Sequence, residues 1–288
     1  MSSDHPPIRP PSEADSILLR LSTGCSHNKC SFCPAYKSIP FTLRSEQAIE
    51  NSLKHSCHLK HKTNLFLCDG DALVAPQTLL LTTFEKIKRI TPWVKRVGTY
   101  ANAKAIATKS DKELKALREA GLKIVHLGLE SGDDCTLNRV MKWGTSSQII
   151  EQAKRLKNAD IKLFVTVLLG LGGTERSLEH ARRTGEALTS MDPNYIGALT
   201  LIPCDNTQLM SKIEQKTFSL PGPEQMLLEL KVMLENTQLS RGIFYANHAS
   251  NYLPLRVRMP REKENALKLL DQAIHNNIPL KPEWMRAL

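Results

Sequence analysis

The residues best suited to chemistry are three cysteines in one short segment. Of the seven cysteines in the chain, Cys25, Cys30 and Cys33 form a C-x4-C-x2-C pattern directly after an apolar stretch. Thiolates are soft ligands that suit iron–sulfur clusters or zinc. Three thiolates would leave one iron of a four-iron cluster without a protein ligand. That iron would be open to a substrate or a cofactor.

Zinc, a ferredoxin-type cluster and chance clustering are the alternatives to an open iron site in this segment. A structural zinc site needs a fourth ligand, which His27, Cys57 or Cys68 could supply. A ferredoxin-type cluster needs a fourth cysteine at a matching spacing, and none follows closely. A disulfide framework is disfavoured, because the number of cysteines is odd and the chain has the composition of a cytosolic protein.

Strand and helix patterns alternate around these cysteines. Helical patterns include Pro76–Ile90, and capping boxes at Ser110–Glu113 and Thr145–Gln148 predict two helix starts, while Thr174 is expected to cap a further helix. The short strands are rich in Leu, Val and Ile, which suits strands buried on both faces of a parallel sheet. The predicted strands are Ile17–Leu21, Leu65–Asp69, Arg96–Tyr100, Ile124–Leu129, Leu163–Leu169 and Ile196–Leu201.

Six such units over residues 15–215 predict an α/β fold with a mostly parallel sheet. Six units are too few for a closed eight-stranded barrel, so an open sheet and a partial barrel both remain possible. The predicted organisation is a Pro-rich leader at 1–14, a core at 15–215 and an accessory segment at 216–288. In this segment we expect helices at Pro221–Leu239 and Arg261–Ile274, on either side of 243–257.

Composition indicates a cytoplasmic protein with a basic surface. The polar, Pro-rich start is not a secretory signal, and no apolar run is long enough for a membrane span. The formal net charge of +10 favours an anionic partner such as RNA, a phosphorylated metabolite or a carboxylate. Scattered basic residues and only 5% aromatic residues favour instead an ordinary solvated surface.

The cysteine segment resembles the cluster loop of the radical S-adenosylmethionine (SAM) superfamily. The usual spacing there is C-x3-C-x2-C with an aromatic residue before the third cysteine, a position that Phe32 fills. This chain has one extra residue between Cys25 and Cys30. The resemblance implies a partial (β/α)6 TIM-like barrel of the radical SAM type with a helical C-terminal extension.

The resemblance continues over about 200 residues, always at the carboxyl ends of predicted strands. It implies that the 69–71 turn receives the SAM amino group and that 128–133 meets the ribose and methionine part. Lys142 stands where an Arg pairs with the SAM carboxylate, although a solvated lysine is an equal alternative. The 170–173 turn would pack on adenine. The cofactor-binding residues implied in this way are Phe32, Asp69, Gly70, Asp71, Asn102, Glu130, Ser131, Lys142 and Gly170.

The resemblance also implies a reaction. Cys25, Cys30 and Cys33 would hold a [4Fe–4S] cluster, and a flavodoxin or ferredoxin-type protein would donate an electron for cleavage of SAM to a 5′-deoxyadenosyl radical. A small-molecule substrate is expected; an RNA substrate, or a non-enzymatic electron carrier, are alternatives. Cys204 is a weak catalytic candidate, with a plain buried cysteine as the favoured alternative, and Cys57, Cys68, Cys135 and Cys204 are expected not to bind the cluster. The polar block 247–252 would line the substrate pocket or serve as a connecting loop.

Overall fold

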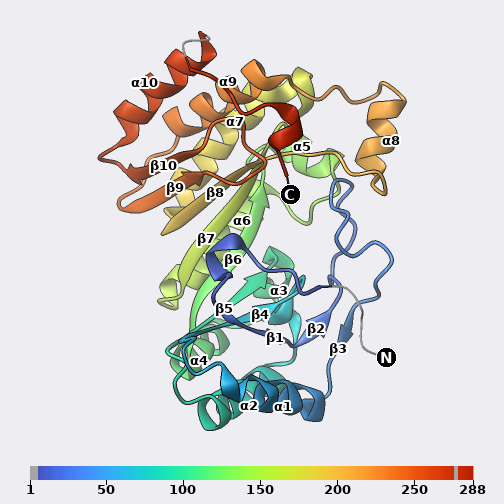
Figure 1. Cartoon of the computed structure of the whole chain (residues 1–288), viewed down its shortest axis with the longest axis vertical. Coiled ribbons are helices and arrows are strands. Elements are labelled where there is room, and N and C mark those ends of the chain that lie inside the picture. The colour runs from blue at the N-terminus through green and yellow to red at the C-terminus, as the bar shows by residue number, and fades with distance from the viewer. Residues whose placement is uncertain (1–5, 276–277, 288) are drawn as a thin grey trace. The chain divides into compact units, whose positions relative to one another are not determined.

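The computed structural model describes residues 6–275 and 278–287 and has the predicted alternation of strands and helices (Figure 1). Eight strands form an open, mostly parallel sheet, so the predicted α/β class is confirmed. Their order is β1 (Ile17–Arg20), β4 (Asn64–Cys68), β5 (Arg96–Ala101), β6 (Leu122–Glu130), β7 (Lys162–Leu169), β8 (Tyr195–Thr200), β9 (Gly242–Ala246) and β10 (Leu255–Met259). Each of the six predicted strands lies within two residues of its observed bounds.

The chain divides into two compact units, which are described separately. The first contains Met1–Asn28, Ala35–Leu127 and Gln152–Leu163. The second contains Lys29–Pro34, Gly128–Glu151 and Phe164–Leu288. Both the cysteine segment and β6 are therefore divided between the two units.

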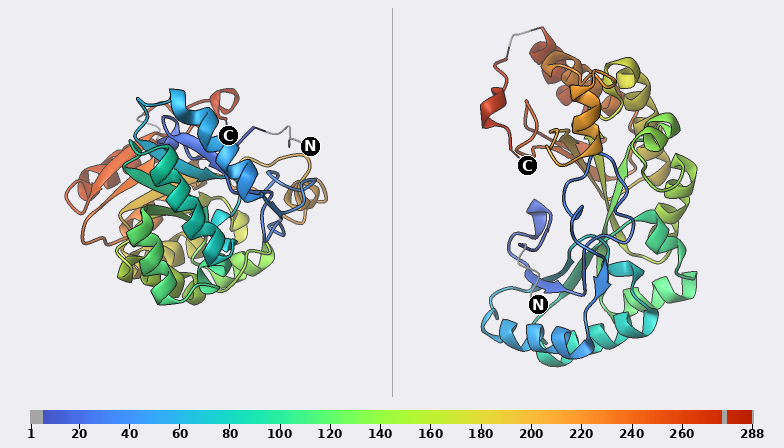
Figure 2. Two further views of the ribbon diagram at one scale, coloured as in Figure 1. Left: turned by 90° about the horizontal axis from the view of Figure 1, so that it is seen from below. Right: turned by 90° about the vertical axis from the view of Figure 1, so that its right-hand side faces the viewer.

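In the first unit, β1, β4, β5 and most of β6 pair in parallel. The β4 residues Leu65, Phe66 and Leu67 are at most 1% exposed, as continuous apolar strands require when both faces are covered. A short antiparallel pair, β2 (Ser22–Thr23) and β3 (Thr42–Leu43), flanks the cysteine segment. The helices are α1 (Glu46–His55), α2 (Gln77–Ile90), α3 (Ala103–Ala107) and α4 (Asp111–Ala120). The α2 helix packs against α1 and α4, in the blue to green part of Figure 2. The capping box at Ser110 and Glu113 is confirmed.

The described part of the leader is packed into the first unit. The N–H of Asp69 donates to the carbonyl of Ile8 over 3.2 Å, and the Ile8 N–H donates back to Asp69 Oδ1 over 3.3 Å. Further along, the short 3₁₀ turn Pro11–Glu13 buries the Glu13 carboxylate among Ser16, Arg96 and His126. Figure 1 shows this segment, in dark blue, crossing in front of the strands. Sequence patterns alone do not indicate these contacts, because they join residues distant in sequence.

In the second unit, β7, β8 and β9 pair in parallel and β10 pairs antiparallel with β9. The accessory segment, expected to be helical, thus also contributes two strands. Leu255–Met259 alternates buried and exposed residues, which is the period-2 pattern of a strand with one covered face. The helices are α5 (Asp134–Arg139), the first part of α6 (Ser146–Asn158), α7 (Gly173–Met191), α8 (Gln208–Glu214), α9 (Pro223–Glu235) and α10 (Lys263–Ile274). The rest of α6, from Gln152, belongs to the first unit.

Two predicted helix starts in the second unit had different outcomes. Thr145 and Gln148 form the expected reciprocal bonds at the start of α6. The prediction that Thr174 caps α7 is wrong, because α7 begins at Gly173 after Gly172 and no side chain caps it. Throughout the described residues, no helix is long and apolar enough to cross a membrane.

Candidate functional site

The three clustered cysteines are divided between the units: Cys25 belongs to the first, and Cys30 and Cys33 belong to the second. All three thiols are partly exposed and none forms a disulfide. Within the ranges 6–275 and 278–287, no three His, Cys, Asp or Glu side chains are gathered as metal ligands. Whether a cluster fits therefore depends on how each unit holds its own cysteines.

In the first unit, Cys25 lies directly against Gly70. The Gly70 N–H donates to the carbonyl of Gly24 over 3.2 Å. A Cβ at Gly70 would lie 2.7 Å from that carbonyl oxygen and 2.8 Å from the Cys25 Cβ, closer than such atoms normally approach. Only glycine lets the end of β4 pack so closely on the cysteine backbone. Gly70 is therefore part of what fixes the position of Cys25.

Next to Cys25, three polar residues join the ends of β4 and β5 to the cysteine segment. Asp71 Oδ2 accepts from Ser26 Oγ over 2.5 Å and from Asn102 Nδ2 over 2.6 Å. Asn102 Oδ1 in turn accepts from the Ala105 N–H and so caps α3. Asp71 is fully buried. Two of the predicted cofactor residues, Asp71 and Asn102, thus lie together beside the first cysteine.

The buried side chain of Asp69 connects several segments of the first unit. Its backbone is left-handed, with φ of +71°, and its side chain is fully buried. Asp69 Oδ2 lies 2.8 Å from Arg20 Nε in an ion pair whose alignment is not that of a hydrogen bond. Tyr36 Oη donates to Asp69 Oδ1 over 3.4 Å. These partners give Asp69 a structural function that its motif position did not indicate.

In the second unit, the segment from Cys30 to Cys33 is anchored on both sides of Phe32. The Ser31 N–H donates to the Val140 carbonyl over 2.9 Å, and the Ser31 carbonyl accepts from the Leu209 N–H over 3.0 Å. Phe32 packs against an apolar cluster formed by Val140, Leu171, Leu201, Leu209 and Phe218. The aromatic ring before the third cysteine thus holds this turn in place by apolar packing.

These features fit an iron–sulfur cluster. The donors are three thiols of the soft type that iron prefers, all partly exposed, and each unit fixes its own part of the segment. Gly70 also lets the end of β4 pack directly on the Cys25 backbone, which any side chain would prevent. The donor set of Cys25, Cys30 and Cys33 is therefore chemically suited to the group.

Glu130 and Lys142 form an ion pair at the end of β6. Lys142 Nζ lies 2.9 Å from Glu130 Oε1, and each side chain is 12% exposed. A side chain at Gly128 would collide with both the carboxylate and the ammonium group. The alternative of a freely solvated Lys142 is therefore wrong. A polar ligand could bind these side chains only if the ion pair rearranged or if the ligand extended it.

Ser131 and Gly170 belong to a buried polar network around Glu229 and His180. The Gly170 N–H donates to Glu229 Oε1 over 2.5 Å, and Ser177 Oγ donates to Glu229 Oε2 over 2.6 Å. His180 Nε2 bonds the Leu168 carbonyl, and Nδ1 bonds Ser131 Oγ over 2.7 Å. Because a carbonyl only accepts, Nε2 is the donor in the bond to Leu168. The network ties the ends of β6 and β7 to α7 and α9.

Sequence reasoning missed Glu229 and His180. Both are fully buried, and a Cβ at Gly170, where φ is +83°, would collide with Met226 of α9. One sequence signal could have identified Glu229: it is the single acidic residue within the apolar stretch 226–234. Buried carboxylates need hydrogen-bond partners, so such a residue indicates a polar network inside the fold.

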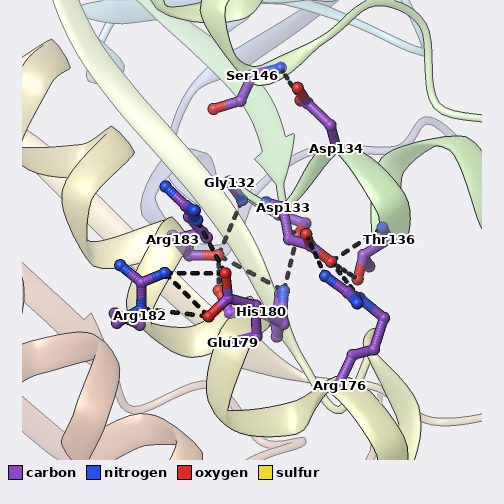
Figure 3. Close-up of polar contacts among 12 residues, drawn as sticks. Gly132, Asp133, Asp134, Thr136, Ser146, Arg176, Glu179, His180, Arg182 and Arg183 are labelled. Carbon is purple, nitrogen blue, oxygen red and sulfur yellow. Dashed lines mark hydrogen bonds and ion pairs between the residues drawn. The ribbon is translucent and has the colours of Figure 1, made fainter.

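Asp133 connects α5 to α7, as Figure 3 shows. Its carboxylate caps α5 by accepting from the Thr136 N–H and forms a two-point ion pair with Arg176, at 2.8 and 2.9 Å. Burial alone would raise the pKa of Asp133, but the bonds from Arg176 and Thr136 outweigh it and lower the pKa to about 2. Asp133 therefore stays ionised and fixes the loop after Glu130.

The remaining cysteines have different environments. Burial raises the pKa of Cys68 to about 12, so its thiol stays protonated and unreactive. Burial and the neighbouring Asp205 also raise the pKa of Cys204, which favours a plain thiol there. Cys57 and Cys135 are exposed.

The polar block 247–252 has mainly structural contacts. Asn251 bonds the carbonyl of Ala198 and the hydroxyl of Thr200, and Ser250 Oγ accepts from the Thr200 N–H. Asn251 thus satisfies groups at the end of β8. The Arg286 guanidinium then bonds the Ser250 carbonyl and lies over the Tyr252 ring at 4.1 Å. The expectation of a connecting segment fits these contacts.

Comparison with known proteins identifies a family whose model matches this chain. A family model described as the Radical SAM superfamily matches residues 19–184. A biotin synthase from Buchnera aphidicola subsp. Schizaphis graminum (strain Sg) is 24% identical over 159 residues, covering 54% of this chain and 45% of that protein. The chain thus spans less than half the length of this curated relative.

Solved structures share the fold at low sequence identity. The radical SAM methyltransferase TsrM from Kitasatospora setae has a TM-score of 0.57 at 16% identity, covering 69% of this chain and 38% of that one. Coproporphyrinogen III oxidase HemN from Escherichia coli has a TM-score of 0.56 at 13% identity, covering 76% and 51%. Methylornithine synthase PylB has a TM-score of 0.53 at 15% identity, covering 77% and 63%. At these identities the likeness concerns the fold alone.

Proposed function

The chain belongs to the radical SAM superfamily of enzymes, and from this premise we propose that it cleaves SAM reductively and acts on a small-molecule substrate. The family uses a [4Fe–4S] cluster and SAM, which together supply a 5′-deoxyadenosyl radical that abstracts hydrogen from a carbon centre. The observation that carries the proposal is the set of three partly exposed thiols at 25, 30 and 33, two of which flank the anchored Phe32.

In this proposal the chain's own residues hold and orient the cofactors. Cys25, Cys30 and Cys33 bind three irons as thiolates. Gly70 keeps the end of β4 close to Cys25, and Phe32 holds the turn that carries the other two cysteines. The network of Glu229 and His180 keeps the ends of β6 and β7 in a fixed conformation.

The polar end of SAM has suitable partners in Glu130 and Lys142. A carboxylate accepts bonds from ribose hydroxyls or an amino group, and an ammonium group neutralises a carboxylate. Because Glu130 and Lys142 already pair at 2.9 Å, we propose that SAM joins this ion pair and extends it. In the first unit, Gly70, Asp71 and Asn102 are proposed to contribute polar groups next to Cys25.

Two further features belong to the same proposal. A cluster of low potential needs an external electron, for which we propose a flavodoxin or ferredoxin-type donor. Reduced thiols and the absence of disulfides among the described cysteines are consistent with the reducing cytoplasm, which we propose as the compartment.

Anaerobic reconstitution tests the proposal directly. Wild-type protein is expected to take up about four irons, as a three-cysteine [4Fe–4S] site implies, and to release 5′-deoxyadenosine from SAM under reducing conditions. Replacing Cys25, Cys30 and Cys33 together by Ala should abolish both. The matched control replaces the exposed Cys57 and Cys135 by Ala, which should leave both unchanged. Iron retained by the triple variant would refute the ligand assignment.

A further inference from the structure

The four strands of the second unit have two unlike faces. One face carries Val165, Val167, Ile196, Ala198 and Phe244, all buried. On this side α7 packs against α9, and α9 packs against α10. The other face carries residues of alternate register that remain partly or fully exposed: Phe164, Thr166, Leu168, Tyr195, Leu199, Ile243, Tyr245, Arg256 and Arg258.

Three aromatic rings lie together on this exposed face. Phe164 and Tyr245 are nearly parallel, with an interplanar angle of 5° and centroids 6.4 Å apart. Tyr195 lies 6.0 Å from Phe164 and 6.5 Å from Tyr245, tilted by about 30° to each. The spacing of these rings allows a flat group to contact several of them at once.

Gly197 makes this arrangement of rings possible. It pairs with Thr166 on one side and with Tyr245 on the other, in the middle of the aromatic group. A Cβ at Gly197 would lie 2.8 Å from Cε1 of Phe164 and 3.1 Å from its Cζ. Glycine therefore lets the Phe164 ring lie close to β8.

Positive charge adjoins the rings. The Arg256 guanidinium lies 5.9 Å from the Tyr245 centroid, a cation–π distance, and Arg258 projects from the same strand face two residues on. Glu262 accepts from the Arg258 backbone N–H and lies 3.7 Å from the Arg261 guanidinium, and its carboxylate also interacts electrostatically with Arg258 and Arg256. Among the described residues, no carboxylate forms an ion pair with either Arg256 or Arg258.

We propose that this aromatic face (Phe164, Tyr195, Tyr245, Arg256 and Arg258) binds a planar, unsaturated small molecule that carries an anionic group. The rings stack on the flat part, and the two guanidinium groups bind the anion, which suits a chain with a net charge of +10. Phe164 and Tyr195 lie near the amino ends of β7 and β8, whereas Gly170 follows the carboxyl end of β7, so the proposal is a binding face separate from the residues proposed for SAM and does not rest on the proposed function.

The test uses anaerobically reconstituted protein and three probes that separate the two features. 2-Naphthoate is planar and anionic, 2-naphthylmethanol is planar and neutral, and cyclohexanecarboxylate is anionic and not planar. Titration calorimetry should show 2-naphthoate binding at least tenfold more tightly than either of the others. Arg256→Gln should weaken 2-naphthoate about tenfold and leave 2-naphthylmethanol unchanged. Tyr245→Leu should weaken both planar probes.

Arg261→Gln is the matched control, because it removes the same charge two residues after β10 from a side chain that is 73% exposed. It should leave the binding of every probe unchanged. Thermal unfolding checks that the variants fold. If folded Arg256→Gln and Tyr245→Leu variants bind 2-naphthoate like wild type, the inference is wrong. Release of 5′-deoxyadenosine is measured on the same samples, so failure of the proposed function would be seen separately from failure of probe binding.

Discussion

Each unit of this protein contains one buried carboxylate close to one buried histidine, but the partners differ. Glu13 lies 3.8 Å from His126 and accepts bonds from Ser16 and Arg96, at 2.5 and 2.9 Å. Glu229 lies 3.3 Å from His180 and accepts bonds from Ser177 and from the backbone of Gly170. Glu13 is 1% exposed and Glu229 is fully buried.

Because their partners differ, the two buried carboxylates are expected to have different functions. Glu13 comes from the leader, and two of its partners, Arg96 and His126, lie on β5 and β6, so the cluster attaches the leader to the sheet. Glu229 instead holds a backbone N–H at the end of β7, next to the segment that includes Ser131. We therefore expect Glu13 to affect folding alone, and Glu229 to affect folding together with cofactor binding.

The largest effect is expected for Glu229→Ala. The change leaves the Gly170 N–H and the Ser177 hydroxyl buried without their acceptor and opens a cavity, which together should cost about 3–5 kcal/mol of unfolding free energy. Urea denaturation measures this loss. Glu229→Gln keeps one acceptor oxygen and should lose less. SAM affinity measured on the Gln variant should also fall; unchanged affinity would contradict a positioning function for Glu229.

Glu13→Ala should have the next largest effect. Ser16 and His126 would lose a buried partner, whereas Arg96 is 30% exposed and can be rehydrated, so we expect a loss of about 2–3 kcal/mol. Glu119→Ala serves as the control, because Glu119 is exposed on α4 and should change stability by less than about 0.5 kcal/mol. A Glu13 variant as stable as this control would show that the leader is not held by its carboxylate.

Lys142→Met separates binding from stability. Lys142 and Glu130 are each 12% exposed, so Lys142→Met removes a mostly buried partner, and thermal unfolding must first show that the variant folds. A charge-assisted contact is typically worth about 1.5–3 kcal/mol, so SAM binding should weaken by roughly one to two orders of magnitude while the cluster still assembles. Glu130→Gln should behave in the same way. Titration calorimetry with SAM decides this, and wild-type affinity in both variants would place the polar end of SAM elsewhere.

The smallest effect is a dependence of stability on pH through His126. Burial lowers the pKa of His126 below its ordinary value of 6.5. The unfolded chain therefore takes up a proton near pH 6.5 that the folded protein does not, and stability falls as the pH drops below about 6.5.

Glu13 adds to this loss at lower pH. Burial alone would raise its pKa, but the nearby His126 and the bonds from Ser16 and Arg96 lower it below 4.5, so its contribution is lost as the pH falls below that value. Urea midpoints between about pH 2 and 8 measure both steps. His126→Gln should flatten the step near pH 6.5 and leave the lower one; the same step in both proteins would exclude His126 as its source.

Much of the fold and the cluster motif could be predicted because both depend on local sequence. Six strands followed from short apolar runs, and the capping boxes at Ser110 and Thr145 from residues three apart. The three cysteines lie in one segment, so their ligand chemistry is visible without a fold. The strands β9 and β10 were missed because a pattern such as Leu255–Met259 needs a covered face to be distinguished from a loop.

The sequence by itself therefore determined the family and the α/β class and predicted the cysteine ligands, because each depends on residue types within a few positions of one another. Only the tertiary structure decided which side chains are paired. Glu13 with His126, Ser131 with His180, Gly170 with Glu229 and Glu130 with Lys142 are separated by 12 to 113 residues along the chain. A buried polar group needs a partner, but nothing local specifies which one; packing of the strands and helices selects it.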